Sequence, residues 1–185
     1  LYRHPEELLQ ACDMMLERAI ATGQRTLENK RGNPKRVFSA LHRGSDGFLN
    51  LKHFEKYYWS YLKKVIFSVT DAGMVFIPFY EGNWEQRLEY MLELPKGKTI
   101  ARFAFTDLKK AKDVLKGHTC IMGGVPHSLL QTGTPNDVDK FCKELIETVG
   151  KGGGFILSPS TGITNEAKPE NVKAMVEAAK KYGRY

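Results

Sequence analysis

The sequence predicts an α/β fold: the C-terminal part of a (β/α)8 TIM barrel, with about five βα units preceded by one helix. Five apolar runs alternate with helical segments, as parallel strands joined by crossover helices do. The runs are almost continuously apolar, which is typical of parallel strands covered on both faces. The last run follows a glycine cluster, stops in the small polar residues from Ser158 to Thr161, and leads to a helix that begins at Pro169. In β/α barrels, such strand ends carry the chemistry.

The first third of the chain predicts a helix, a loop and one βα unit. Segment 5–21 has apolar residues at helical spacing, and segment 24–35 is polar and contains glycine and proline, as loops do. A strand is expected over 37–41. After a polar loop, a long helix is expected over 51–70, and Gly73 is placed to end it as a C-cap glycine.

Two further units follow in the middle of the chain. We expect a strand over 74–79 and a helix through 84–92. The next strand is expected over 100–105. Thr106–Asp107 then supplies good helix-start residues, and Gly117 is placed to close that helix.

The remaining two units complete the pattern. A strand is expected over 120–125, and Thr134–Asp137 supplies a cap, a proline at the first helical position and an acid in the first turn. Glycines 150–154 return the chain to the last strand, over 155–158. Pro169 begins the last helix.

Five units do not close an eight-stranded barrel, which needs about 250 residues. The chain therefore predicts either an open doubly wound sheet or part of a barrel, and the leading helix without a strand of its own favours the barrel. We expect residues 1–185 to form a single domain. Because a truncated barrel exposes sheet edges, we expect a partner: a missing N-terminal half, another chain or a swapped homodimer. The 185 residues alone are expected to be inactive.

Composition and charge narrow the classes of function. The hydrophobic fraction of 42% is ordinary, no window approaches the roughly 18 apolar residues of a membrane span, and the start lacks a signal-peptide core. Three widely spaced cysteines exclude a disulfide framework and indicate a reducing, cytoplasmic setting. The net charge of +7 comes from basic residues interleaved with acids, without a nucleic-acid-binding signature. We expect an anionic small-molecule partner, and neither nucleic acid nor a membrane.

The ends of the predicted strands supply the candidate site residues. As substrate-binding residues we expect His42, Arg43, Tyr80, Asn83, Trp84, Gly124, Ser158, Ser160 and Thr161. Glu81 is the main catalytic candidate, because it follows an apolar strand where partial desolvation favours a protonated carboxyl. Its alternative roles are a solvated loop acid or a partner for Arg87. Asp107 is the second catalytic candidate, and helix capping is its favoured alternative.

His42 and Arg43 directly follow the first strand. Arg43 can bind a carboxylate through bidentate hydrogen bonds. The alternative interpretation is that His42 and Arg43 lie on a surface loop without a binding role. Because all these side chains follow parallel strands, we expect them to converge on a common cavity at one mouth.

The run Gly123 to Pro135 resembles the G-N-x-P-x-x-L-x-x-G-T-P/E segment of the uroporphyrinogen decarboxylase superfamily. Segments 154–157 and 169–175 are similar to that family's last strand and helix. The likeness covers nearly the whole chain but only the C-terminal half to three fifths of the family. It implies a (β/α)8 barrel with its site at the C-terminal strand ends. The family includes cofactor-free decarboxylases of uroporphyrinogen acetate groups, and zinc-dependent methyltransferases that use corrinoid proteins and thiols.

The chain departs from both branches. The resemblance places the zinc ligands of the methyltransferases at Phe79, Glu81 and Thr161, where no thiolate or imidazole is present, so we expect no metal and no cofactor. The decarboxylases end the last strand in Gly-His-Gly, whereas this chain has Ser160-Thr161-Gly162.

The resemblance implies a cofactor-free decarboxylation of an anionic tetrapyrrole as the nearest activity. One alternative is a methyltransferase linked to a corrinoid protein. The other is a degenerate, non-catalytic barrel that serves as a binding module.

Overall fold

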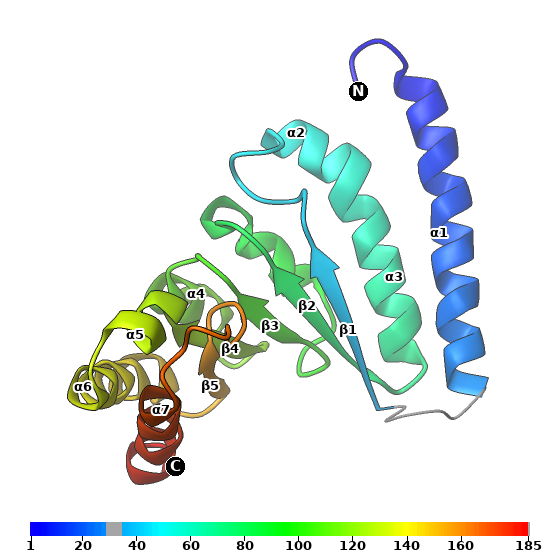
Figure 1. The fold of residues 1–185 in the computed structure, drawn as a ribbon. Helices are drawn as coiled ribbons and strands as arrows, with labels where there is room; N and C mark the ends of the chain where they lie inside the picture. The colour runs from blue at the N-terminus through cyan, green and yellow to red at the C-terminus, as the bar shows by residue number, and fades with distance from the viewer. Residues whose placement is uncertain (29–34, 185) are drawn as a thin grey trace.

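The computed structural model describes residues 1–28 and 35–184 and contains a five-stranded parallel sheet (Figure 1). Its strands are β1 (Arg36–Leu41), β2 (Val75–Tyr80), β3 (Ile100–Phe103), β4 (Cys120–Val125) and β5 (Phe155–Pro159). The strands lie side by side in chain order, and each neighbouring pair is parallel. The predicted α/β class, with parallel strands alternating with helices behind a leading helix, is confirmed.

Helices precede, connect and follow the strands. They are α1 (Pro5–Glu28), α2 (Leu51–Phe54), α3 (Ser60–Asp71), α4 (Leu108–Leu115), α5 (His127–Thr132), α6 (Pro135–Leu145) and α7 (Pro169–Tyr182). The π-helical turn η1 (Glu55–Trp59) joins α2 to α3, so the long helix expected over 51–70 is present; a second such turn, η4 (Ile146–Gly150), follows α6. Helix α1 extends to Glu28, into the segment expected to be a loop, and residues 29–34 of that segment lie outside the described ranges. No helix in those ranges is both long and apolar enough to cross a bilayer.

The α-helix expected over 84–92 was a wrong prediction. The segment forms two short 3₁₀ turns, η2 (Glu85–Arg87) and η3 (Glu89–Glu93). The buried side chains Leu88, Met91 and Leu94 recur every third residue. A 3₁₀ helix has three residues per turn, so this spacing keeps all three side chains on the face that packs against the core.

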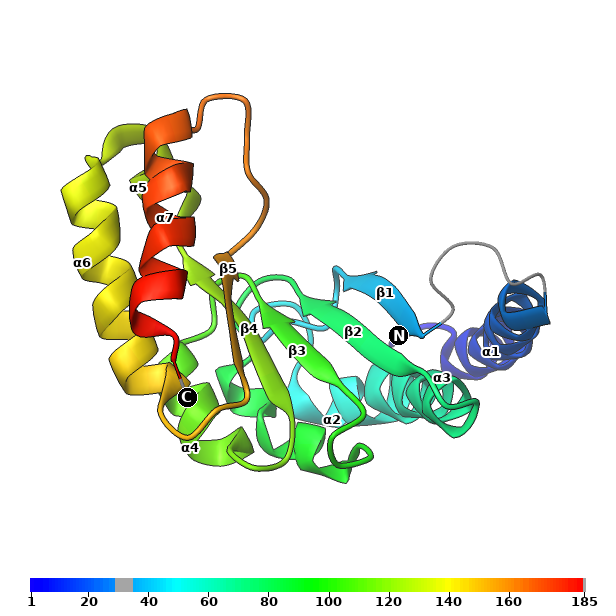
Figure 2. The ribbon, with the colours of Figure 1, turned by 90° about the horizontal axis from the view of Figure 1, so that it is seen from below.

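The main core lies between the sheet and its helices, which gather on one face (Figure 2). Strand residues alternate in direction, and the register aligns Leu41, Tyr80 and Phe103 across β1, β2 and β3. All three are at most 5% exposed and pack in the core with residues of the connecting helices, such as Phe54 and Ile66. Burial of these large apolar side chains stabilises the fold.

The other face of the sheet has no helix over it among the described residues (Figure 2). One register row on this face crosses all five strands, and we name it the inner row: Ala40, Phe79, Arg102, Met122 and Ile156. None of the five is buried. In a closed barrel this face would line the interior.

Candidate functional site

The carboxyl ends of the five strands share one edge of the sheet because the strands are parallel. The residues expected in the site all follow or end strands, so the fold brings them to this edge. They do not share one cavity in the described structure. Some of them belong to three separate groups, which are a carboxylate–imidazole pair, a cavity beside β3 and β4, and a contact with an arginine of the inner row. The others are buried or lie on the loops beside this edge. Neighbouring residues at a strand end point to opposite faces, which separates them.

The first group is the pair formed by His42 and Glu81. Nδ1 of His42 contacts Oε2 of Glu81, which joins the ends of the neighbouring strands β1 and β2 across 39 residues of sequence. The side chains are 66% and 45% exposed. An exposed pair of this kind adds only about 0–1 kcal/mol to stability. A carboxylate that orients an imidazole can hold and move a proton at the strand ends.

A buried ion pair holds the two loops that carry His42 and Glu81. Arg87 Nη1 donates to Asp46 Oδ1, and these side chains are only 1% and 10% exposed. The backbone N–H of Asp46 also donates to the Asn83 carbonyl at 2.8 Å. The partner of Arg87 is therefore Asp46, which corrects the alternative that paired Arg87 with Glu81.

Tyr80 and Trp84 lie in the core rather than in an open site. They are 1% and 0% exposed, their ring centroids are 4.6 Å apart, and burial raises the pKa of Tyr80 well above its usual range. Tyr80 faces the helices because it alternates with Phe79 along β2. Trp84 Nε1 donates to the Glu81 carbonyl at 2.8 Å, so the tryptophan holds the Glu81 backbone in place.

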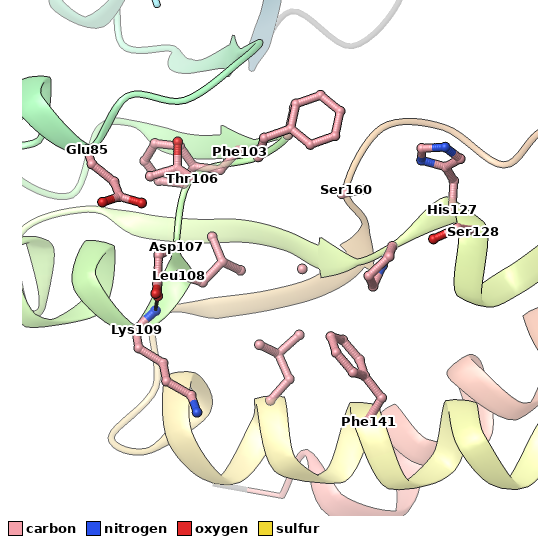
Figure 3. Close-up of a pocket in the computed structure, with 15 residues that line it drawn as sticks. Glu85, Phe103, Thr106, Asp107, Leu108, Lys109, His127, Ser128, Phe141 and Ser160 are labelled. Atoms are coloured by element: carbon pink, nitrogen blue, oxygen red, sulfur yellow. Dashed lines mark hydrogen bonds between the residues drawn. The ribbon is translucent and has the colours of Figure 1, made fainter. Parts of the chain in front are cut away.

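The second group surrounds a cavity of about 490 Å³ (Figure 3). Its walls come from the end of β3, the β3–α4 connection, the end of β4, helix α6 and the residue after β5; the predicted site residues among them are Asp107, Gly124 and Ser160. The volume lies within the range of small-molecule sites. Ser158, by contrast, is buried, and its hydroxyl donates to the Pro159 carbonyl at 3.2 Å.

Asp107 stands on the rim of this cavity as the N-cap of α4. Its side chain accepts hydrogen bonds from the backbone N–H groups of Lys109 at 2.8 Å and Lys110 at 3.2 Å. These bonds satisfy two amides that lack partners inside the helix. The capping role that the sequence favoured for Asp107 is thus present.

His127 also lines the cavity, although the sequence analysis did not select it (Figure 3). Its Nδ1 is buried and has no hydrogen-bond partner among the described residues. Buried ring nitrogens of this kind usually have a partner. The position of His127 two residues after the end of a glycine-containing strand was the signal available in the sequence.

Gly124 limits the size of this cavity, and we expect Gly124→Ala to destabilise the fold by about 2–3 kcal/mol. Its φ is +105°, and an added Cβ would overlap Leu145 and lie 3.0 Å from Cδ1 of Leu108. Urea unfolding measures the change. Gly97→Ala is the matched control, because its φ of +73° adds strain but nothing lies within 4 Å, so about 1–2 kcal/mol is expected. Equal losses in the two variants would refute the steric argument.

The third group is built on Arg102, in the middle of the inner row. Its guanidinium lies 4.8 Å from the centroid of the Phe79 ring, and Nη2 donates to the Thr161 carbonyl. Partial burial lowers the pKa of Arg102. Arg102 was not among the site residues predicted from the sequence, where its signal was a charged side chain inside an apolar strand.

The chemistry of these positions does not fit a zinc ion. Of the three positions that the resemblance links to zinc, Phe79 offers no donor, Thr161 turns its carbonyl to Arg102, and only Glu81 has a side chain that binds metals well. A guanidinium thus touches two of the three. Within residues 1–28 and 35–184, no three His, Cys, Asp or Glu residues group as a metal site.

Arg43 and Asn83 lie on the loops beside the mouth. The guanidinium of Arg43 is exposed and stands 5.0 Å from the centroid of the Phe48 ring. The side-chain oxygen of Asn83 accepts from the backbone N–H of Glu85 at 3.1 Å. Both residues lie near the mouth. The guanidinium of Arg43 has no carboxylate partner within residues 1–28 and 35–184.

Parallel strands that lie in chain order, with the helices on one face of the sheet, are typical of a β/α-barrel type of protein rather than of an open doubly wound sheet. The family model "Uroporphyrinogen decarboxylase (URO-D)" matches residues 1–182. The chain belongs to the uroporphyrinogen decarboxylase family.

Two curated relatives represent the two branches of this family. The chain is 30% identical over 129 residues to the methylcobamide:CoM methyltransferase MtbA of Methanosarcina acetivorans, covering 70% of this chain and 37% of the relative. It is 20% identical over 177 residues to a uroporphyrinogen decarboxylase of Syntrophotalea carbinolica, covering 96% of this chain and 49% of the relative. The chain therefore spans about half or less of their length.

A solved structure shows the same fold. The methyltransferase from Methanosarcina mazei superimposes with a TM-score of 0.73 at 24% identity, covering 95% of this chain and 49% of that chain. The match confirms the barrel-type fold, with this chain corresponding to about half of it.

Proposed function

We propose that this chain contributes to a uroporphyrinogen-decarboxylase-like enzyme that removes CO₂ from acetate side chains of an anionic tetrapyrrole without a metal or an organic cofactor. The observation that carries the proposal is the contact between His42 and Glu81 at the ends of two neighbouring strands. Decarboxylation of a pyrrole acetate needs proton transfers, and this pair is the candidate to make them.

The reaction is balanced without a redox partner. Protonation of a pyrrole ring creates an electron sink, and the bond between the methylene carbon and the carboxylate then breaks. CO₂ leaves, its bonding electron pair passes into the ring, the methylene carbon takes up a proton to become methyl, and the ring releases its proton. In this proposal Glu81, with His42 in contact with its carboxylate, supplies and recovers these protons.

The remaining candidate residues would bind the substrate. Ser160 lines the cavity, and Thr161 is the next residue along the chain, just beyond the end of β5. Arg43 supplies an exposed positive charge at the loop after β1. Hydroxyl and guanidinium groups suit the carboxylates of an anionic tetrapyrrole.

Methyl transfer is the second candidate function, because the relative MtbA is 30% identical over 129 residues. In that case a corrinoid protein would be the partner, coenzyme M or a similar thiol would be the acceptor, and Glu81 would supply an oxygen ligand to a metal. The poor fit of Phe79 and Thr161 to zinc argues for the first candidate.

One assay pair tests the proposal on the full-length protein. Uroporphyrinogen is supplied anaerobically, and products are separated by their number of carboxylates; methyl transfer from methylcobalamin to coenzyme M is followed with added zinc. Loss of carboxylates supports the decarboxylase, and zinc-dependent methyl transfer overturns it. Absence of both activities, together with tight binding of a corrinoid protein, would indicate the binding module instead.

A further inference from the structure

Arg102 is the one charged member of the inner row, where its neighbours in register are Phe79 and Met122. These neighbours are apolar and only partly buried. A charged side chain in an apolar row loses hydration, which is costly unless another group replaces the water. The position of Arg102 therefore calls for a partner.

Arg87 and Arg102 are both at least partly buried beside the sheet, but they differ in their hydrogen-bond and ion-pair partners. Arg87 is buried, donates to Asp46 and to the Leu49 carbonyl, and lies against Phe54. Arg102 donates only to the carbonyl of Thr161, and no carboxylate pairs with it in the described ranges. The Nε atoms of both arginines are buried without a hydrogen-bond partner there, so the difference between the two is the carboxylate that only Arg87 contacts. Arg87 is thus a structural ion pair, whereas Arg102 retains donors for an anion.

Two contacts fix where the guanidinium of Arg102 lies. The ring of Phe79 supports its flat face, and the Thr161 carbonyl, 59 residues away, holds Nη2. Thr161 follows the end of β5, so the side chain reaches from the middle of the sheet toward the strand ends. The positive charge therefore lies on the inner face of the sheet, toward the carboxyl ends of the strands.

We propose that Arg102 is an anion-binding residue of this mouth in addition to Arg43, and that its guanidinium holds an oxyanion of the substrate where the methyltransferase branch would place zinc. The inference rests on the proposed function for the identity of the oxyanion, which is then a carboxylate of the tetrapyrrole. A sulfonate such as that of coenzyme M has the same chemistry for a guanidinium. Arginine suits both because its donors form a planar fork.

The test is a binding titration with the full-length protein and two probes. Uroporphyrin, the stable oxidised octacarboxylate, is followed by fluorescence, and coenzyme M by calorimetry. We expect Arg102→Gln to weaken binding of the recognised probe about 10- to 100-fold, as loss of charge-assisted hydrogen bonds does. Arg36→Gln is the matched control: Arg36 is exposed on the same sheet face, at the amino end of β1, and its variant should bind within about twofold of wild type.

The outcomes separate this inference from the proposed function. If the Arg102→Gln variant loses binding of uroporphyrin, both the inference about Arg102 and the decarboxylase proposal are supported. If it loses coenzyme M, and uroporphyrin does not bind the wild type, Arg102 stands and the decarboxylase proposal falls. If uroporphyrin binds wild type and Arg102→Gln equally, the inference about Arg102 falls alone. If neither probe binds the wild type, the anion site is overturned.

A second measurement does not depend on the folding of a variant. Phenylglyoxal modifies accessible arginines, and peptide mass spectrometry reports each position. We expect the bound probe to protect Arg102 in the wild-type protein and to leave Arg36 unprotected. Equal modification of Arg102 with and without a saturating probe would contradict the proposal.

Discussion

Glu81→Gln should lower the decarboxylation rate constant about 10²- to 10⁴-fold, the contribution that a positioned acid or base makes. The amide has the size of the carboxylate and can still hydrogen-bond to Nδ1 of His42, so the loops should keep their arrangement. It cannot supply or recover a proton. Product analysis after anaerobic incubation with uroporphyrinogen gives the rate constant.

Glu144→Gln provides the matched control for this substitution. Glu144 makes an exposed ion pair with Lys109 on the helix surface, with side chains 69% and 58% exposed. Its loss should leave the rate constant within about twofold of wild type. A Glu81→Gln enzyme that turns over at the wild-type rate, with unchanged thermal unfolding, would remove Glu81 from the chemistry.

Asp46→Ala should lower the free energy of unfolding by about 3–5 kcal/mol. The substitution leaves the guanidinium of Arg87, which is 1% exposed, without its carboxylate. The loops after β1 and β2 also lose the ion pair between Asp46 and Arg87 that holds His42 close to Glu81. Urea unfolding monitored by tryptophan fluorescence measures the change, and Trp84 lies beside the affected loops.

A double variant separates the unpaired charge from general damage to the loops. Asp46→Leu combined with Arg87→Met removes both charges, and apolar replacements of a buried pair are often neutral or stabilising. The double variant should therefore recover most of the stability that Asp46→Ala loses. Glu144→Ala, which breaks an exposed pair, should cost less than about 1 kcal/mol. A loss below that value for Asp46→Ala would contradict the role assigned to the buried pair.

Local patterns in the sequence were enough for most of the elements. The apolar runs identified both ends of all five strands to within two residues, because a short apolar run bounded by turn residues is typical of a buried strand. Asp107 and Thr134 mark the starts of α4 and α6, since the side chain of each accepts a hydrogen bond from backbone amides two or three residues ahead. The 3₁₀ turns over 85–93 escaped prediction because helix-like spacing does not distinguish three from 3.6 residues per turn.

The candidate site was predicted only in part. The sequence placed Glu81 and His42 at strand ends, but their contact spans 39 residues and depends on the pairing of β1 with β2. Tyr80 and Glu81 are neighbours in sequence, yet only the alternation of β2 against the helices sends Tyr80 into the core. A residue's position at a predicted strand end shows at which edge of the sheet it lies, but not toward which face its side chain points.

By itself, the sequence determined the order and direction of the strands, the type of most connecting elements, and the edge at which polar residues collect, because these follow from apolar spacing and capping within a few residues. Only the tertiary structure decided that Asp46 pairs with Arg87 and that Arg102 reaches Thr161, 59 residues away, without a carboxylate partner in the described ranges. Such contacts depend on which residues the packed sheet brings together. The number of residues between two positions in the sequence does not predict their distance in space.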